Sequence, residues 1–127
     1  MRRLAILAAL LAAPALPALA LAADGPPPGK YTGKLTAPAR LKGTWALTFA
    51  KNGTYVIAQN GKIVVRGHDL SIGPQMQLYK ETGPLACTAL GFYNFKRTGK
   101  TLTFEQLSDK KCAGRALVLS HRFTLVT

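Results

Sequence analysis

The segment from Gly43 to Arg66 constrains the fold most, because apolar side chains recur at every second position between turns that contain Asn-Gly. Alternation of this kind over about 4–8 residues is typical of a β-strand with one buried face. The Asn52-Gly53 and Asn60-Gly61 dipeptides are strong hairpin signals. The segment therefore predicts a meander of three strands, over residues 44–50, 54–59 and 62–66.

The length of each turn sets which side chains share a face. A three-residue loop at residues 51–53 pairs Phe49 with Tyr55, and the same loop at residues 59–61 pairs Ile57 with Ile63. Two-residue turns would separate these apolar pairs, because a one-residue slip turns every side chain to the other face. The expected inner face then comprises Trp45, Leu47, Phe49, Tyr55, Ile57, Ile63 and Val65, with Val56 and Val64 outward.

Short apolar segments, separated by Gly, Pro, Asn or Asp, continue to the end of the chain without a sustained helical period. One turn of helix is possible at residues 36–41. Short strands with short connections predict an all-β fold. Because closure into a barrel removes the exposed edges of a sheet, we expect an up-and-down antiparallel barrel of eight or nine strands. The remaining strands are expected at residues 30–36, 70–73 after a turn at His68-Asp69, 75–80, 89–96, 101–107 and 115–126, the last as one bent strand or two short ones.

The first 23 residues have the three parts of a signal peptide. Arg2 and Arg3 precede an apolar run at residues 4–13. This run is shorter than the ~20 apolar residues that a membrane span needs. Cleavage is expected after one of three small residues, Ala20, Ala22 or Ala23. The protein is therefore predicted to be secreted or periplasmic, with no transmembrane segment after processing.

The rest of the chain is long enough for one domain with a single core. Residues 24–29, DGPPPG, are predicted to be a Pro-rich flexible leader, and residues 30–127 the barrel domain. Cys87 and Cys112 allow one pairing, and neither has a neighbouring Cys or His at metal-ligand spacing. We expect a structural disulfide, no metal site and no cofactor.

Basic residues dominate the charge, with 17 Lys and Arg against 5 Asp and Glu. Removal of Arg2 and Arg3 with the signal peptide still leaves a strongly basic chain. This balance favours encounters with anionic partners such as envelope polysaccharide, lipid headgroups or acidic proteins. The cations are scattered over expected turns and strand ends, and no nucleic-acid-binding motif accompanies them. Specific nucleic-acid binding is therefore not expected.

Five short motifs lie along the mature chain: Gly43-Thr44-Trp45, the turn at residues 52–55, Gly83-Pro84 before Cys87, GFYNF at residues 91–95, and Asp-x-x-Cys-x-x-Arg at residues 109–115. In combination they resemble the lipocalin-like, or calycin-type, β-barrels, specifically the short secreted bacterial ones. The resemblance implies that Trp45 packs at a closed end, with an arginine from a late strand across its indole. That arginine is Arg115 or, alternatively, Arg122. The implied role of Trp45 and Arg115 is structural.

Function depends on whether the barrel is hollow, because a small barrel can hold one ligand or be filled by its own side chains. A lipocalin-like chain this short, without a clear C-terminal helix, leaves both options open. The first hypothesis is a non-enzymatic protein that binds a small apolar or amphipathic ligand inside the barrel. The alternative is a filled barrel that acts through its basic surface, on a protein in the manner of an inhibitor or on an envelope polyanion. The expected ligand-binding residues are Phe49, Tyr55, Tyr93, Phe95, Leu102 and Phe104.

Catalytic chemistry has little support in the sequence. Ser71 or Ser120 could combine with His121 and Asp69, but no nucleophile-elbow motif accompanies them. His68, Asp69 and His121 have no further strong donor to complete a metal site. A Gly-rich phosphate loop is absent from the sequence. The sequence therefore predicts a protein that is not an enzyme.

Overall fold

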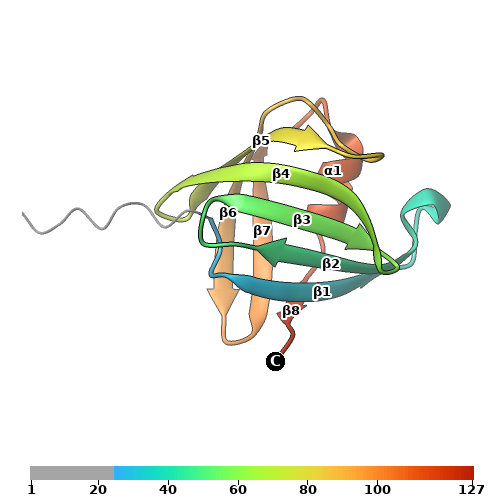
Figure 1. Cartoon of the computed structure of the whole chain (residues 1–127), viewed down its shortest axis with the longest axis horizontal. Helices are drawn as coiled ribbons and strands as arrows, with labels where there is room; N and C mark the ends of the chain where they lie inside the picture. Colours follow the sequence, from blue (N-terminus) through green and yellow to red (C-terminus); the bar gives the residue numbers. More distant parts are fainter. Residues whose placement is uncertain (1–24) are drawn as a thin grey trace, which may run out of the picture.

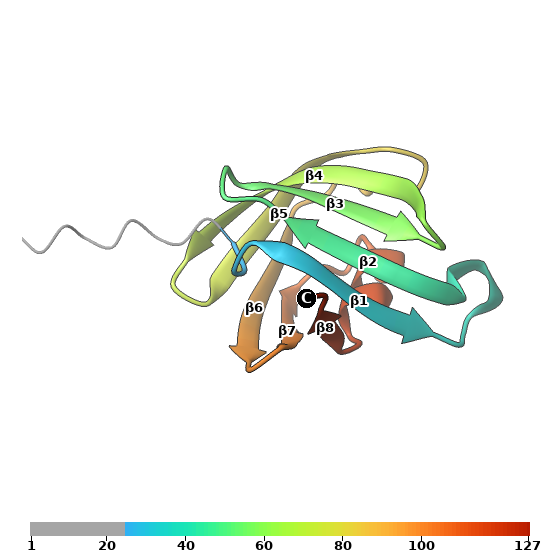
Figure 2. The ribbon, with the colours of Figure 1, turned by 60° about the horizontal axis from the view of Figure 1, so that its bottom comes forward.

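The computed structural model describes residues 25–127, so the predicted signal peptide and Asp24 lie outside the described residues. Eight strands form one closed antiparallel barrel in chain order (Figures 1 and 2), which confirms the predicted all-β up-and-down barrel. A short 3₁₀ helix and one α-helix complete the fold. The elements are β1 Gly29–Leu35, η1 Ala39–Leu41, β2 Gly43–Phe49, β3 Thr54–Gln59, β4 Lys62–Ile72, β5 Gln75–Thr82, β6 Gly91–Thr98, β7 Thr101–Ser108, α1 Ala113–Leu119 and β8 Phe123–Leu125.

The two ends of the barrel differ in what covers them. One end, here called the leader end, carries residues 25–28 and the β2–β3, β4–β5 and β6–β7 turns. The other, here called the helix end, carries η1, residues 83–90 and α1. In Figure 1 the β2–β3 and β4–β5 turns lie on the left, the orange β6–β7 turn lies at the bottom, and the cyan η1 lies on the right. Trp45 is buried at the helix end, where its indole Nε1 donates a hydrogen bond to the carbonyl of Leu41 at 2.7 Å.

The first hairpin has the predicted register. Phe49 pairs with Tyr55, and Leu47 pairs with Ile57. Gly53 adopts a φ of 79°, the left-handed conformation that a three-residue loop closing in a G1 bulge requires. All four of the paired side chains are buried in the core. The alternation of apolar residues therefore predicted correctly which side chains of this hairpin face the interior.

The predicted register of the second hairpin is wrong. Asn60 and Gly61 both have positive φ and form a two-residue turn, so that Gln59 pairs with Lys62 and Ile63 lies outside, 43% exposed. A bulge at Val64 then shifts the register by one residue. Ile57 therefore pairs with Val65, and both side chains face the interior. The bulged Val64 is buried, and its carbonyl accepts a hydrogen bond from the Leu85 N–H at 3.0 Å. A distant loop thus stabilises the bulge.

Strand β4 continues through His68 and Asp69, where the sequence predicted a turn. The register shifts between Arg66 and His68, which places Gly67 at an irregularity. A Cβ on Gly67 would lie 2.4 Å from the Tyr55 ring, so this residue makes room for the phenol. The strand continues past Gly67 instead of ending, and Asp69 and Ser71 are buried beyond it.

The leader is packed against the barrel at residues 25–28, which contradicts the predicted flexible leader over those residues. Pro26 is fully buried, and the Tyr31 hydroxyl donates a hydrogen bond to the carbonyl of Pro27 at 2.7 Å. A Cβ on Gly25 would lie 1.6 Å from Oδ2 of Asp69, which shows how closely the leader covers this carboxylate. The leader therefore covers one end of the barrel.

Helix α1 occupies part of the segment that was expected to form a strand at residues 115–126. Its Val118 and Leu119 are buried against the core, and the chain then re-enters the barrel as the three-residue strand β8. β8 pairs with both β7 and β1 and closes the sheet. An apolar segment at the chain end thus covers the helix end before it completes the barrel.

Candidate functional site

The aromatic residues that were expected to line a ligand cavity instead pack against one another. Phe49 contacts Tyr55 and Phe104, with ring centroids 6.1 and 6.3 Å apart, and Tyr93 meets Phe104 edge to face at 6.5 Å. Phe49, Tyr55, Tyr93 and Leu102 are buried. Phe95 and Phe104 are partly buried and pack against the same core. The six residues predicted to bind a ligand therefore lie together in or against the hydrophobic core.

A small cavity lies at the helix end. Its volume is about 80 Å³, and Leu41, Trp45, Val118 and the buried Arg115 are among its lining residues. An engineered cavity that binds benzene measures ~150 Å³, so this space suits a few waters better than a ligand. None of the six residues predicted to bind a ligand lines it.

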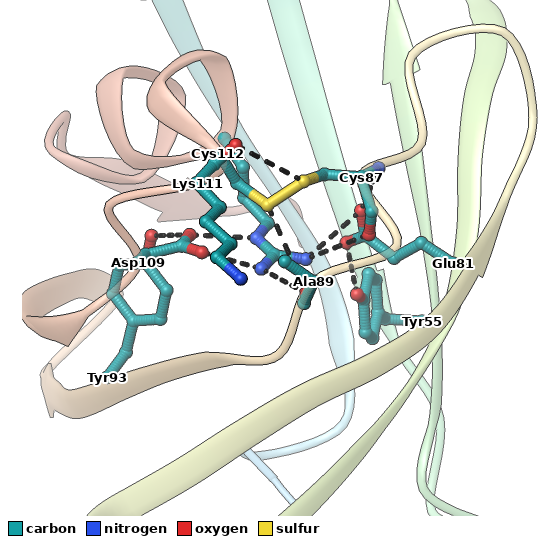
Figure 3. The surroundings of a disulfide bond; sticks show 9 residues. Tyr55, Glu81, Cys87, Ala89, Tyr93, Asp109, Lys111 and Cys112 are labelled. Atoms are coloured by element: carbon teal, nitrogen blue, oxygen red, sulfur yellow. Dashed lines mark hydrogen bonds and ion pairs between the residues drawn. A yellow bond between two sulfur atoms is a disulfide. The ribbon is translucent and has the colours of Figure 1, made fainter.

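The most unusual feature of the interior is a buried ionic network centred on Arg115 of α1 (Figure 3). Its guanidinium binds Asp109 in a bidentate manner, with Nε 2.8 Å from Oδ2 and Nη2 2.6 Å from Oδ1. Nη1 lies 3.2 Å from Oε1 of Glu81 on β5. Gly91 permits this arrangement, because a Cβ there would lie 2.6 Å from Nη2. One cation therefore joins a helix, a strand and a loop.

The hydrogen-bonding groups of the network are well satisfied. The Tyr55 hydroxyl donates to Glu81, and the Tyr93 hydroxyl donates to Asp109. Arg115 also donates to the carbonyls of Cys87 and Ala89, at 3.4 and 2.8 Å. Buried charges without such partners would be costly. The two tyrosines thus use their O–H donors on buried carboxylates, which leaves only the acceptor capacity of the hydroxyls for any other partner.

Burial sets the protonation states of these groups. It raises the pKa of Tyr55 and of Tyr93 far above that of a free phenol, and the hydrogen bonds to the two carboxylates act in the same direction. Burial alone would lower the pKa of Arg115, but the hydrogen bonds with Asp109 and the charges of Asp109 and Glu81 raise it. The phenols therefore stay neutral and the guanidinium stays charged at ordinary pH.

The predicted disulfide between Cys87 and Cys112 is present and lies beside this network (Figure 3). The backbone N–H of Cys87 donates to Oε1 of Glu81 at 2.9 Å, and Cys112 immediately precedes α1. The bond therefore holds the loop after β5 against the start of the helix. Its position supports the structural role that we expected, because it fixes the two segments that enclose Arg115.

Burial of the acidic side chains changes the charge of the surface. Within residues 25–127 the carboxylic side chains are Asp69, Glu81, Glu105 and Asp109, and all except Glu105 are buried. Every Lys and Arg side chain in the same range is exposed, apart from Arg115. The described surface is thus almost purely cationic, more so than the net charge of the chain indicates.

Arg115, which the resemblance placed across the indole of Trp45, lines the same cavity as this indole, but carboxylates bind its guanidinium. Arg115 is on a helix rather than a strand, and its guanidinium binds Asp109 and Glu81. Arg122 is exposed. Sequence reasoning missed Glu81 and Asp109 as partners of Arg115. The Asp-x-x-Cys-x-x-Arg motif contained a signal for one of them, since it joins Asp109 and Arg115 through the disulfide cysteine.

The residues considered for catalysis are dispersed. Ser120 and His121 follow α1, where the Ser120 Oγ lies 3.3 Å from the His121 Nδ1. Asp69 and Ser71 lie near the leader end on β4, and His68 faces outward against Tyr79. No group of three or more His, Cys, Asp or Glu side chains that could hold a metal ion occurs within residues 25–127. The same range contains no helix with the length and hydrophobicity to cross a membrane.

Comparison of the chain with protein-family models, curated proteins and solved structures gave no match. The lipocalin-like resemblance therefore stands on the motifs and on the closed eight-stranded barrel.

Proposed function

We propose that this protein is a secreted or periplasmic, non-enzymatic β-barrel of lipocalin-like type that binds anionic polymers or surfaces of the cell envelope through its cationic exterior. The observation that carries the proposal is the separation of charge between interior and surface. Asp69, Glu81 and Asp109 are buried, whereas the cations other than Arg115 are exposed. Because few surface carboxylates offset the exposed cations, the field outside the barrel attracts polyanions.

The packing of the interior supports a role at the surface. The six residues predicted to bind a ligand occupy the core, and the cavity at the helix end is about 80 Å³. Binding of a small apolar ligand inside the barrel stays a prediction, and no observation described above favours it over the surface role. The disulfide is compatible with an oxidising compartment outside the cytoplasm.

The proposal predicts salt-dependent binding to a sulfated polysaccharide. Titration of the processed protein with fluorescent dextran sulfate should give saturable binding, and uncharged dextran should give none. The dissociation constant should rise by about tenfold or more between 50 and 200 mM salt, since each contact releases a counterion. Absence of binding at physiological ionic strength, or an affinity that salt leaves unchanged, would contradict the proposal.

A further inference from the structure

The last part of β4, at the leader end, inverts the usual distribution of side chains in a barrel. Its inward positions hold the polar residues Asp69 and Ser71, and both are buried. Its outward positions hold Leu70 and Ile72, which are 50% and 77% exposed. Apolar side chains normally occupy the inner face of a strand. At 77% exposed, Ile72 is the most exposed large apolar side chain of the described residues, and an apolar partner would bury it.

The apolar surface extends from this tip over the neighbouring strands. Leu70 and Ile72 of β4, together with Phe92 of β6, border a shallow groove of about 170 Å³, whose floor includes Gln75 and Gln77 of β5. Gly73 and Pro74 follow Ile72 and form the turn. The β4–β5 turn lies on the left of Figure 1. Gln77 pairs with both Leu70 and Phe92 across the sheet, so glutamines separate the two apolar sides of the groove, and the exposed apolar surface at the tip itself consists of Leu70 and Ile72.

Cationic residues lie on both sides of this tip around the barrel rim. On one side, the Asp69 N–H donates to the carbonyl of Gly53 at 2.9 Å, which places the β2–β3 turn and its Lys51 beside the start of the tip. On the other side, the Phe95 N–H donates to the carbonyl of Pro74 at 2.8 Å, directly before Lys96. The β6–β7 hairpin then contributes further cations. The exposed cations on the two sides are Lys51, Lys96, Arg97 and Lys100.

We propose that the leader end docks onto an anionic lipid bilayer, with Ile72 and Leu70 inserted at the headgroup boundary and the flanking cations on the lipid phosphates. This inference rests on the proposed function and names its partner. A soluble acidic polysaccharide would use the cations but would leave the isoleucine in water. A lipid surface can bind the cations and also bury the isoleucine, because anionic headgroups attract cations while the acyl region accepts apolar side chains. A second copy of this chain is disfavoured, since the cations would face one another.

Co-sedimentation with vesicles tests the inference directly. The processed protein should bind vesicles of phosphatidylcholine and phosphatidylglycerol at a ratio of about three to one, and it should not bind pure phosphatidylcholine. Ile72→Ser should weaken vesicle binding by about tenfold through loss of apolar burial, while dextran sulfate binding stays unchanged. Lys96→Gln should weaken vesicle binding by about fivefold, the equivalent of ~1 kcal/mol per cation at an anionic surface.

The matched control is Ile63→Ser, at the other end of the barrel, where the replaced isoleucine is 43% exposed. This variant should bind vesicles like the parent, and unchanged melting temperatures would show that all three variants are folded. Equal loss of vesicle binding in Ile63→Ser and Ile72→Ser would overturn the assignment to the leader end. Binding to dextran sulfate without vesicle binding would overturn this inference and leave the proposed function standing, whereas loss of both would overturn both. Self-association that Ile72→Ser abolishes, without vesicle binding, would assign the tip to a second copy instead.

Discussion

Replacement of Arg115 by alanine is expected to lower the free energy of unfolding by about 3–5 kcal/mol, because it leaves two buried carboxylates without their counter-charge. Asp109 would lose a bidentate partner at 2.6 and 2.8 Å, and Glu81 an ion pair at 3.2 Å. Urea unfolding at neutral pH measures the change.

Arg40→Ala is the matched control for this prediction. Arg40 is an exposed arginine in η1 that lies near the same helix, as its Nη1 would be 3.7 Å from a Cβ on Gly114. Its loss should change the unfolding free energy by no more than about 0.5 kcal/mol. If Arg115→Ala and Arg40→Ala unfold at the same urea concentration as the parent, the network does not hold the helix to the barrel.

Replacement of Trp45 by alanine should destabilise the barrel by about 3–5 kcal/mol, as truncation of large aromatic core residues does. The indole is 2% exposed and anchors η1 through its hydrogen bond to the Leu41 carbonyl. Its removal would enlarge the cavity at the helix end, which Trp45 lines. Thermal and urea unfolding measure the loss.

Trp45→Phe separates the two contributions of this residue. Phenylalanine keeps most of the apolar volume but leaves the Leu41 carbonyl without its indole donor, so the loss should be smaller, about 1–3 kcal/mol. A parent-like melting curve for Trp45→Ala would show that the indole does not hold the helix end together.

The two hairpins show where sequence patterns suffice and where they fail. At the first turn, Gly53 and the flanking apolar residues agree on one register, and the register is as predicted. At the second turn the same pattern gave the wrong register, because Asn60 and Gly61 form a two-residue turn and a bulge at Val64, whose carbonyl binds the Leu85 N–H, then returns Val65 to the inner face. That contact comes from a loop far along the chain. A local sequence pattern contains no information on this contact with the bulge.

The sequence did not predict the buried ionic network around Arg115 for a related reason. Glu81 and Asp109 resemble ordinary surface residues in a basic chain, and their burial depends on Arg115, which lies on a helix instead of the expected strand. The seven residues of α1 are too few for a helical period to be recognised against an apolar strand. The six residues predicted to bind a ligand do face the interior, but the sequence pattern did not show that they pack against one another in the core.

The central claim is that the interior is filled and that the function lies on the cationic exterior. Native mass spectrometry of the exported protein tests this claim most directly, because a ligand held in a barrel survives gentle ionisation. The spectrum should show the processed chain with one disulfide and no discrete adduct. A stoichiometric apolar molecule retained by the protein, and released when the chain is unfolded, would contradict the claim and favour a ligand carrier.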